Sequence, residues 1–154
     1  MARRFWLLKS EPSVFSIDDL GKAPKKTTCW DGICNFQARN FLREIKKGDG
    51  ILFYHSSADP PGVAGTATVV AEAVPDPRQF DRGSDKHDAA SKPEDPRWYG
   101  VEIKLEAKFP RFVSLDEIRA VPALAEMILV KRSRLSVQPV TADEWNTIVK
   151  LGAR

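Results

Sequence analysis

Residues 101–109 read VEIKLEAKF, and apolar and charged side chains alternate along the whole segment. Successive side chains of a β-strand point to opposite faces of the sheet, so this alternation predicts a strand with one buried and one solvated face. Half-buried strands of this kind are typical of antiparallel sheets. The segment therefore indicates that an antiparallel sheet forms the framework of the fold.

Three other segments predict strands of the same sheet. Residues 5–9, FWLLK, are almost continuously apolar, as expected of a strand that is buried on both faces. Residues 51–55, ILFYH, follow a glycine-containing turn, and residues 63–74 are rich in small and β-branched side chains. Gly65, inside the last segment, predicts a bulge or a barrel corner.

Short helices are predicted between the strands. Ser16, followed by two acidic residues, predicts the N-cap of a helix that runs to about Gly21. Asn35 predicts the N-cap of a second helix, which ends at Gly48 and carries one apolar stripe. The residues of that stripe are Ala38, Phe41, Leu42 and Ile45.

Two capping boxes, at residues 114–117 and 141–144, predict two further short helices. Helices and strands do not alternate as βαβ units, which argues against a doubly wound parallel sheet. We therefore expect an α+β fold, a small, mainly antiparallel, bent β-barrel with short helices around it. The 154 residues fit one domain, with a long flap or functional loop at about residues 75–97.

The sequence lacks the features of membrane and metal proteins. No apolar stretch approaches the roughly 18 residues that cross a bilayer, and Lys9 ends the N-terminal apolar run, so we expect a soluble, cytoplasmic protein. Cys29 and Cys34 are too few for a disulfide framework, and their spacing is not that of a usual zinc site. With only His55 and His87 as further soft ligands, we expect reduced thiols and no metal or cofactor.

The charge is unevenly distributed along the chain. The net charge is +3, but residues 1–57 carry 10 basic and 6 acidic side chains, residues 58–100 carry 5 and 8, and residues 101–154 carry 9 and 7. Basic ends and an acidic middle suit a face that binds a polyanion, although solvated faces produce the same split.

The motifs of common enzyme families are missing. The sequence contains no G-x-S-x-G, H-E-x-x-H, G-x-x-x-x-G-K-[ST] or G-x-G-x-x-G motif, and no zinc deaminase pattern. One possible acid–base pair remains: Lys9 and Glu11, two residues apart, form either a small catalytic site or an ion pair at a strand end.

Aromatic side chains beside polar ones indicate a binding site. Trp30 lies in the polar, turn-like segment CWDG, where an indole either plugs the end of the barrel or lines an opening. Tyr54 and His55 end a strand just before Ser56, so they would present a phenol and an imidazole at the rim. The basic run of Lys131, Arg132 and Arg134 either binds phosphate or forms a solvated turn. Together these groups suit a flat heterocycle attached to phosphate.

Four segments in this order resemble the EVE domain family. They are KSEP at residues 9–12, WDGICNFQARN at 30–40, FYHS at 53–56, and LSVQPVT at 135–141 with Trp145. The resemblance runs from about Arg4 to Leu151. It implies a PUA-like fold related to the YTH and ASCH domains, and a reader of modified bases such as 5-methylcytosine in DNA or RNA.

The resemblance also implies site residues. Trp30 would be the stacking platform, with the remaining base-pocket positions at Ser10, Glu11, Asn35, Tyr54, His55, Ser56, Arg134 and Ser136. Asn35 has the helix cap as its alternative role. Phosphate contacts are expected from Lys9, Arg39, Lys131 and Arg132. EVE domains commonly carry Arg at the position of Cys34 and Tyr at that of Phe36, so we expect a lower affinity here.

Three functions follow, in order of preference. The first is a monomeric, non-catalytic reader of a modified base that is flipped from a duplex or already single-stranded. The second is an ASCH-like hydrolase of a modified nucleoside that uses Lys9 and Glu11. The third is a protein-binding scaffold with a vestigial pocket.

Overall fold

The computed structural model describes residues 3–30, 36–75, 77–84, 87–94, 99–131 and 135–153. Its strands are β1 (Phe5–Ser10), β2 (Thr27–Trp30), β3 (Gly50–His55), β4 (Gly62–Pro75), β5 (Tyr99–Ser114) and β6 (Val137–Val140). Its α-helices are α1 (Ile17–Lys22), α2 (Phe36–Glu44), α3 (Leu115–Ala120), α4 (Ile128–Lys131) and α5 (Ala142–Gly152). Three 3-10 helices are η1 (Pro24–Lys26), η2 (Pro77–Phe80) and η3 (Pro122–Leu124).

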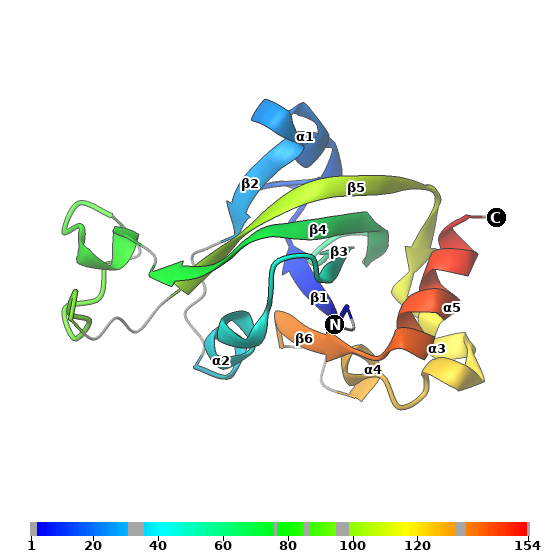
Figure 1. Cartoon of the computed structure of the whole chain (residues 1–154). Helices are drawn as coiled ribbons and strands as arrows, with labels where there is room; N and C mark the ends of the chain where they lie inside the picture. Colours follow the sequence, from blue (N-terminus) through cyan, green and yellow to red (C-terminus); the bar gives the residue numbers. More distant parts are fainter. Residues whose placement is uncertain are drawn as a thin grey trace.

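The described strands form one sheet with the order β2-β5-β4-β3-β1-β6. Its neighbouring strands are antiparallel, except for the parallel pair β1 and β3. Figure 1 shows β4 and β5 crossing the centre of the molecule, with β2 and α1 on one side and α3, α4 and α5 at the other end. The α+β class and the mainly antiparallel sheet are confirmed. The predicted barrel is not closed among the described residues, because the edge strands β2 and β6 do not pair with each other.

Strand β5 extends beyond the alternating segment that predicted it. It continues to Ser114, because β4 pairs with it from the Gly62–Ser114 pair to the Pro75–Tyr99 pair. The register shifts between Val63 and Gly65, which confirms the bulge predicted at Gly65. A Cβ atom at Gly65 would lie 2.3 Å from the backbone oxygen of Ala107, so the close approach of the two strands requires glycine there.

Helix α2 ends at Glu44, so the predicted end at Gly48 is wrong. The buried carboxylate of Asp49 accepts hydrogen bonds from the Lys46 amide (2.9 Å) and from the indole of Trp6 (2.9 Å). The Lys46 amide therefore bonds to a side chain instead of continuing the helix. Gly48 has φ of 95° and makes the turn into β3.

Two apolar clusters lie on opposite faces of β1 and β3. The first packs the sheet against α1 and α2 and includes Trp6, Leu8, Ile17, Leu20, Trp30, Leu42 and Phe53. The second packs the sheet against α3, α4 and α5 and includes Leu7, Leu52, Tyr54, Ile118, Leu129, Trp145 and Ile148. Because neighbouring strand residues point to opposite faces, the strand alternation decides which predicted site residues can meet.

Beyond the sheet, the connection between β4 and β5 projects away from the rest of the molecule (Figure 1). Gln79 is buried there, and its backbone oxygen accepts a hydrogen bond from the Asp88 amide (3.0 Å). Among the described residues, no helix is long and apolar enough to span a bilayer. The cytoplasmic location, the single domain and the monomeric state stay predictions.

Candidate functional site

Trp30 is the last residue of the edge strand β2 and pairs with Val101 of β5. The first two residues of the predicted turn-like segment CWDG are therefore strand, and Asp31 and Gly32 lie outside the described residues. Its side chain points into the first apolar cluster and is 8% exposed, whereas Cys29 is exposed on the other face. The indole meets Phe53 edge-on, with ring centroids 5.7 Å apart. The indole is therefore nearly enclosed, in contact with the middle of the sheet.

The indole N–H of Trp30 has no hydrogen-bond partner among the described residues. The indole nitrogen is itself fully buried, so water does not satisfy this donor. A buried donor without an acceptor destabilises a protein by about 1–3 kcal/mol. The Trp30 N–H is thus a donor whose unmet bond a bound ligand could supply.

Ser10 and His55 lie on the same sheet face as Trp30, side by side at the ends of β1 and β3. Ser10 Oγ donates a hydrogen bond of 2.5 Å to the backbone oxygen of Phe15. The His55 ring meets Phe53 edge-on at 5.7 Å and Phe112 at 6.1 Å. Trp30, Phe53 and His55 therefore form a continuous row of rings, which we call the aromatic row.

The surroundings of His55 make its imidazole neutral. The backbone N–H of Ile17, the first residue of α1, donates to Nε2 at 3.1 Å, so this nitrogen carries no proton. Burial lowers the pKa of His55, and the nearby carboxylate of Asp18 only partly opposes that effect. The proton then resides on Nδ1, which remains a donor.

Tyr54 and Lys9 lie on the opposite face of the sheet. The Tyr54 side chain is 3% exposed within the second apolar cluster. The ammonium nitrogen of Lys9 lies 5.5 Å from the centroid of the Tyr54 ring, and burial lowers the pKa of Lys9. The structure therefore does not bring these two side chains together with Trp30.

Three further predicted residues surround the end of β1. The Ser56 amide donates to the Ser10 carbonyl (2.8 Å), and the Lys9 amide donates to the Ser136 carbonyl (3.0 Å). Glu11 is exposed, and its carbonyl turns the chain toward α1 by accepting from the amides of residues 14 and 15. Ser56 and Ser136 thus lie beside the end of β1, where Ser10 is next to His55 of the aromatic row.

The predicted phosphate contacts have other partners in the structure. The Arg39 guanidinium donates to Oδ1 of Asn40 (2.9 Å), on the same helix. Lys131, at the end of α4, forms an ion pair with Glu126. Asn35, Arg132 and Arg134 lie outside the described residues.

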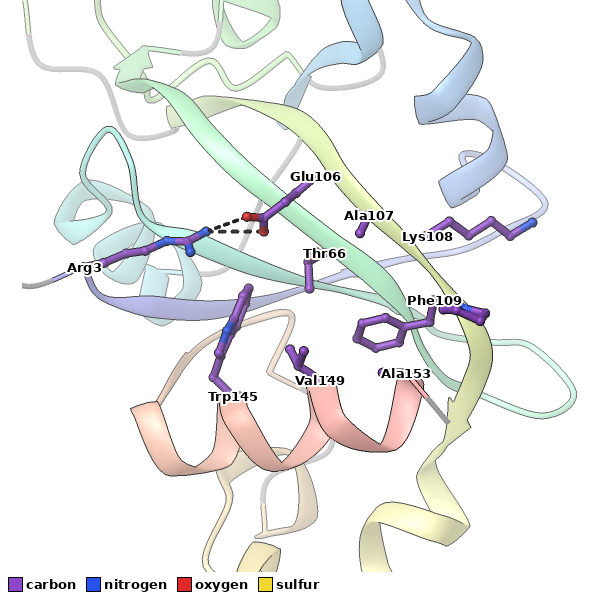
Figure 2. Close-up of a pocket in the computed structure, with 10 residues that line it drawn as sticks. Arg3, Thr66, Glu106, Ala107, Lys108, Phe109, Trp145, Val149 and Ala153 are labelled. Atoms are coloured by element: carbon purple, nitrogen blue, oxygen red, sulfur yellow. Dashed lines mark hydrogen bonds and ion pairs between the residues drawn. The ribbon is translucent and has the colours of Figure 1, made fainter.

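A cavity of about 400 Å³ lies elsewhere, between α5 and β5. Figure 2 shows Phe109 of β5 and Trp145 and Val149 of α5 around it, with the ion pair between Arg3 and Glu106 (3.4 Å) at one end. Phe109 and Trp145 belong to the second apolar cluster, so this cavity is separate from the aromatic row.

Sequence patterns did not predict the contacts of His55. Its hydrogen bond with Ile17 and its contact with Phe112 join segments far apart in the chain. Strand alternation alone could have shown that Phe53 and His55 share a face, and that Tyr54 does not.

Comparison with known proteins identifies the family. The EVE domain matches residues 4–151, which is nearly the whole chain. The chain belongs to the EVE domain family. Human thymocyte nuclear protein 1 is 40% identical to this EVE domain in an alignment 163 positions long, which covers 95% of this chain and 72% of that protein.

Solved structures place the EVE domain among PUA-like folds. The structure of human THYN1 protein in complex with 5-methylcytosine containing DNA has a TM-score of 0.92 and 40% identity, and covers 98% of both chains. The YTH domain of Zygosaccharomyces rouxii MRB1 protein, solved in complex with N6-methyladenosine RNA, has a TM-score of 0.56 and 18% identity over 98% of this chain and 87% of that chain. The YTH likeness shows the shared fold.

Proposed function

We propose that this EVE domain is a non-catalytic module that binds nucleic acid carrying a modified base of the 5-methylcytosine type. The observation that carries the proposal is the match to human THYN1, which was solved with 5-methylcytosine containing DNA and matches over 98% of both chains. At 40% identity the two chains share their fold throughout, so a common binding surface is the simplest expectation.

The base would bind at the aromatic row. Cytosine presents acceptors and a donor along its Watson–Crick edge. The N–H of Trp30 and the Nδ1–H of His55 would donate to its acceptors. The Ser10 hydroxyl, whose proton is donated to Phe15, would accept from its donor. Because only 8% of Trp30 is exposed, a base can stack on the indole only if neighbouring side chains move. A hydrogen bond from the indole edge is a second way in which Trp30 would hold the base.

Two substitutions of Trp30 separate these roles. Trp30→Phe keeps an aromatic ring but removes the N–H, and we expect it to weaken binding by roughly 3- to 10-fold, the loss of one hydrogen bond. Trp30→Ala also removes stacking, which is worth roughly 1–3 kcal/mol, so we expect a further loss of roughly 5- to 150-fold. Calorimetry with matched oligonucleotides that carry 5-methylcytosine or cytosine measures both effects.

Trp145→Phe is the matched control, because Trp145 is equally buried but lies in the second apolar cluster. Thermal unfolding of each variant shows whether the core is intact. Binding that is indifferent to Trp30, or to the methyl group, would contradict the proposed function.

The hydrolase alternative required Lys9 and Glu11 on one strand face. Strand β1 ends at Ser10, so its alternation does not extend to Glu11. The Lys9 ammonium lies over Tyr54, on the face opposite the aromatic row. We therefore retain the non-catalytic proposal.

A further inference from the structure

Three lysines lie together next to the edge strand β2. Lys22 is the last residue of α1, and Lys25 and Lys26 belong to η1, directly before β2. All three side chains are exposed, and none of them forms an ion pair with any carboxylate of the described residues. We call these three residues the basic ridge.

The nearest acidic side chains of α1 already have partners. The carboxylate of Asp18 forms an ion pair with Lys108 at 2.7 Å, and that of Asp19 accepts the Ser16 amide at 2.8 Å. Asp18 also interacts electrostatically with Lys22, but neither carboxylate forms an ion pair with Lys25 or Lys26, so these two lysines keep their positive charge available for an external anion.

Two of the ridge lysines also adopt an unfavourable backbone. Lys25 has φ of 56° and Lys26 has φ of 55°, in the left-handed region where a side chain costs about 1 kcal/mol or more relative to glycine. The same chain uses glycine at Gly48, where φ is 95°. Strained residues of this kind cluster at ligand-binding positions, where the side chain has a use that glycine cannot supply.

The ridge and the aromatic row lie at opposite ends of the same strand. β2 runs from Thr27, next to Lys26, to Trp30. Three residue steps along a strand span roughly 10 Å, which is about three nucleotide steps along one strand of duplex DNA. A nucleic acid that runs along the free edge of β2 would thus bring phosphates to the lysines at one end of the strand. One of its bases would lie at the Trp30 end, where it would have to enter toward the inward-pointing indole.

We propose that Lys22, Lys25 and Lys26 bind the phosphate backbone of the nucleic acid whose modified base binds at the aromatic row. This inference rests on the proposed function, because that function supplies the polyanion. It also shifts the expected phosphate contact from Lys131, which already has a carboxylate partner, to the other side of the molecule.

The salt dependence of binding tests this inference. We compare the wild type with the double variant Lys25→Gln/Lys26→Gln, using duplex and single-stranded oligodeoxynucleotides that carry one 5-methylcytosine. Each lost phosphate contact should reduce the slope of log affinity against log salt by about 0.9 on duplex and about 0.7 on single strands. The double variant should therefore have a slope that is shallower by about 1.8 or 1.4.

The matched control is Arg119→Gln/Lys150→Gln, which also removes two exposed positive charges, from α3 and α5 at the far end of the molecule (Figure 1). Its slope should equal that of the wild type. An unchanged slope in the ridge variant, or equal changes in both variants, overturns the inference. The ratio of the affinities for 5-methylcytosine and cytosine oligonucleotides tests the proposed function separately. If that ratio is one but the salt slope still depends on the basic ridge, the modified-base proposal fails and the phosphate contacts of the basic ridge stand.

Discussion

At the scale of single residues, the site depends on hydrogen-bonding groups whose partners are decided by burial. The Trp30 N–H is enclosed without an acceptor, whereas the similar N–H of Trp6 bonds to Asp49 at 2.9 Å. His55 caps the first residue of α1 through Nε2, which couples its protonation to the helix beside the site. The N–H of the Trp30 indole is thus available to a ligand, whereas the His55 imidazole both bonds to the start of α1 and belongs to the candidate site.

The His55 contact predicts a pH dependence of stability. Burial holds the pKa of His55 below its value in the unfolded chain, so the unfolded chain takes up the proton first as the pH falls. Stability is therefore complete above about pH 6.5 and decreases as the pH falls below it. Denaturant unfolding between pH 7 and pH 5 should show this slope in the wild type and lose it in His55→Gln.

His87 is exposed and provides the control. His87→Gln should retain the pH dependence of the wild type. A slope that persists in His55→Gln would show that another group titrates in this range.

At the scale of elements, side chains that bond to the backbone decide where helices begin and end. Thr141 forms the predicted capping box at the start of α5, and the predicted N-cap at Ser16 is also a full capping box. At the start of α3, the Ser114 side chain accepts from the Glu117 amide. Helix α2 ends early because the buried Asp49 carboxylate, which also accepts from Trp6 across the sheet, accepts the Lys46 amide. Capping by near neighbours is predictable, whereas capping by a tertiary contact is not.

The strained backbone of η1 predicts that glycine stabilises it. Lys25→Gly/Lys26→Gly removes two left-handed side chains, and we expect the free energy of unfolding to rise by roughly 1 kcal/mol after the greater flexibility of glycine in the unfolded chain is included. Lys22→Gly, at the last residue of α1, should instead lower it by at most about 1 kcal/mol, the value for a helix interior. Denaturant midpoints measure both, and a destabilised double-glycine variant would show that η1 carries no strain.

At the scale of the whole molecule, one sheet joins two apolar clusters. Strands β1 and β3 contribute to both of them, with Leu7 and Leu52 on one face and Leu8 and Phe53 on the other. Because both clusters pack on the same two strands, loss of packing in one cluster also displaces the strands that carry the other. The protein should therefore unfold as one cooperative unit.

Paired substitutions on neighbouring residues test this cooperativity. Leu7 and Leu8 are both 0% exposed, and Leu→Ala at either should lower the free energy of unfolding by roughly 2–5 kcal/mol. Each variant should shift a single transition that circular dichroism and tryptophan fluorescence report at the same midpoint. Val14→Ala, at a residue that is 77% exposed, should change little. Two separate transitions would show that the clusters unfold independently.

The sequence by itself determined the features that depend on near neighbours. The alternation at residues 101–109, the caps at Ser16 and Thr141 and the bulge at Gly65 are local, because side-chain direction and capping follow from the positions of adjacent residues. The composition of the motifs also indicated the family, which the match over residues 4–151 confirms.

Only the tertiary structure decided the arrangement of the candidate site. Strand pairing between β2 and β5 placed Trp30 at a strand end, and packing brought its indole against Phe53 of β3. The unmet N–H of Trp30 and the hydrogen bond from Ile17 to His55 depend on contacts between segments far apart in the chain. Such contacts are set by register and packing, which no local pattern encodes.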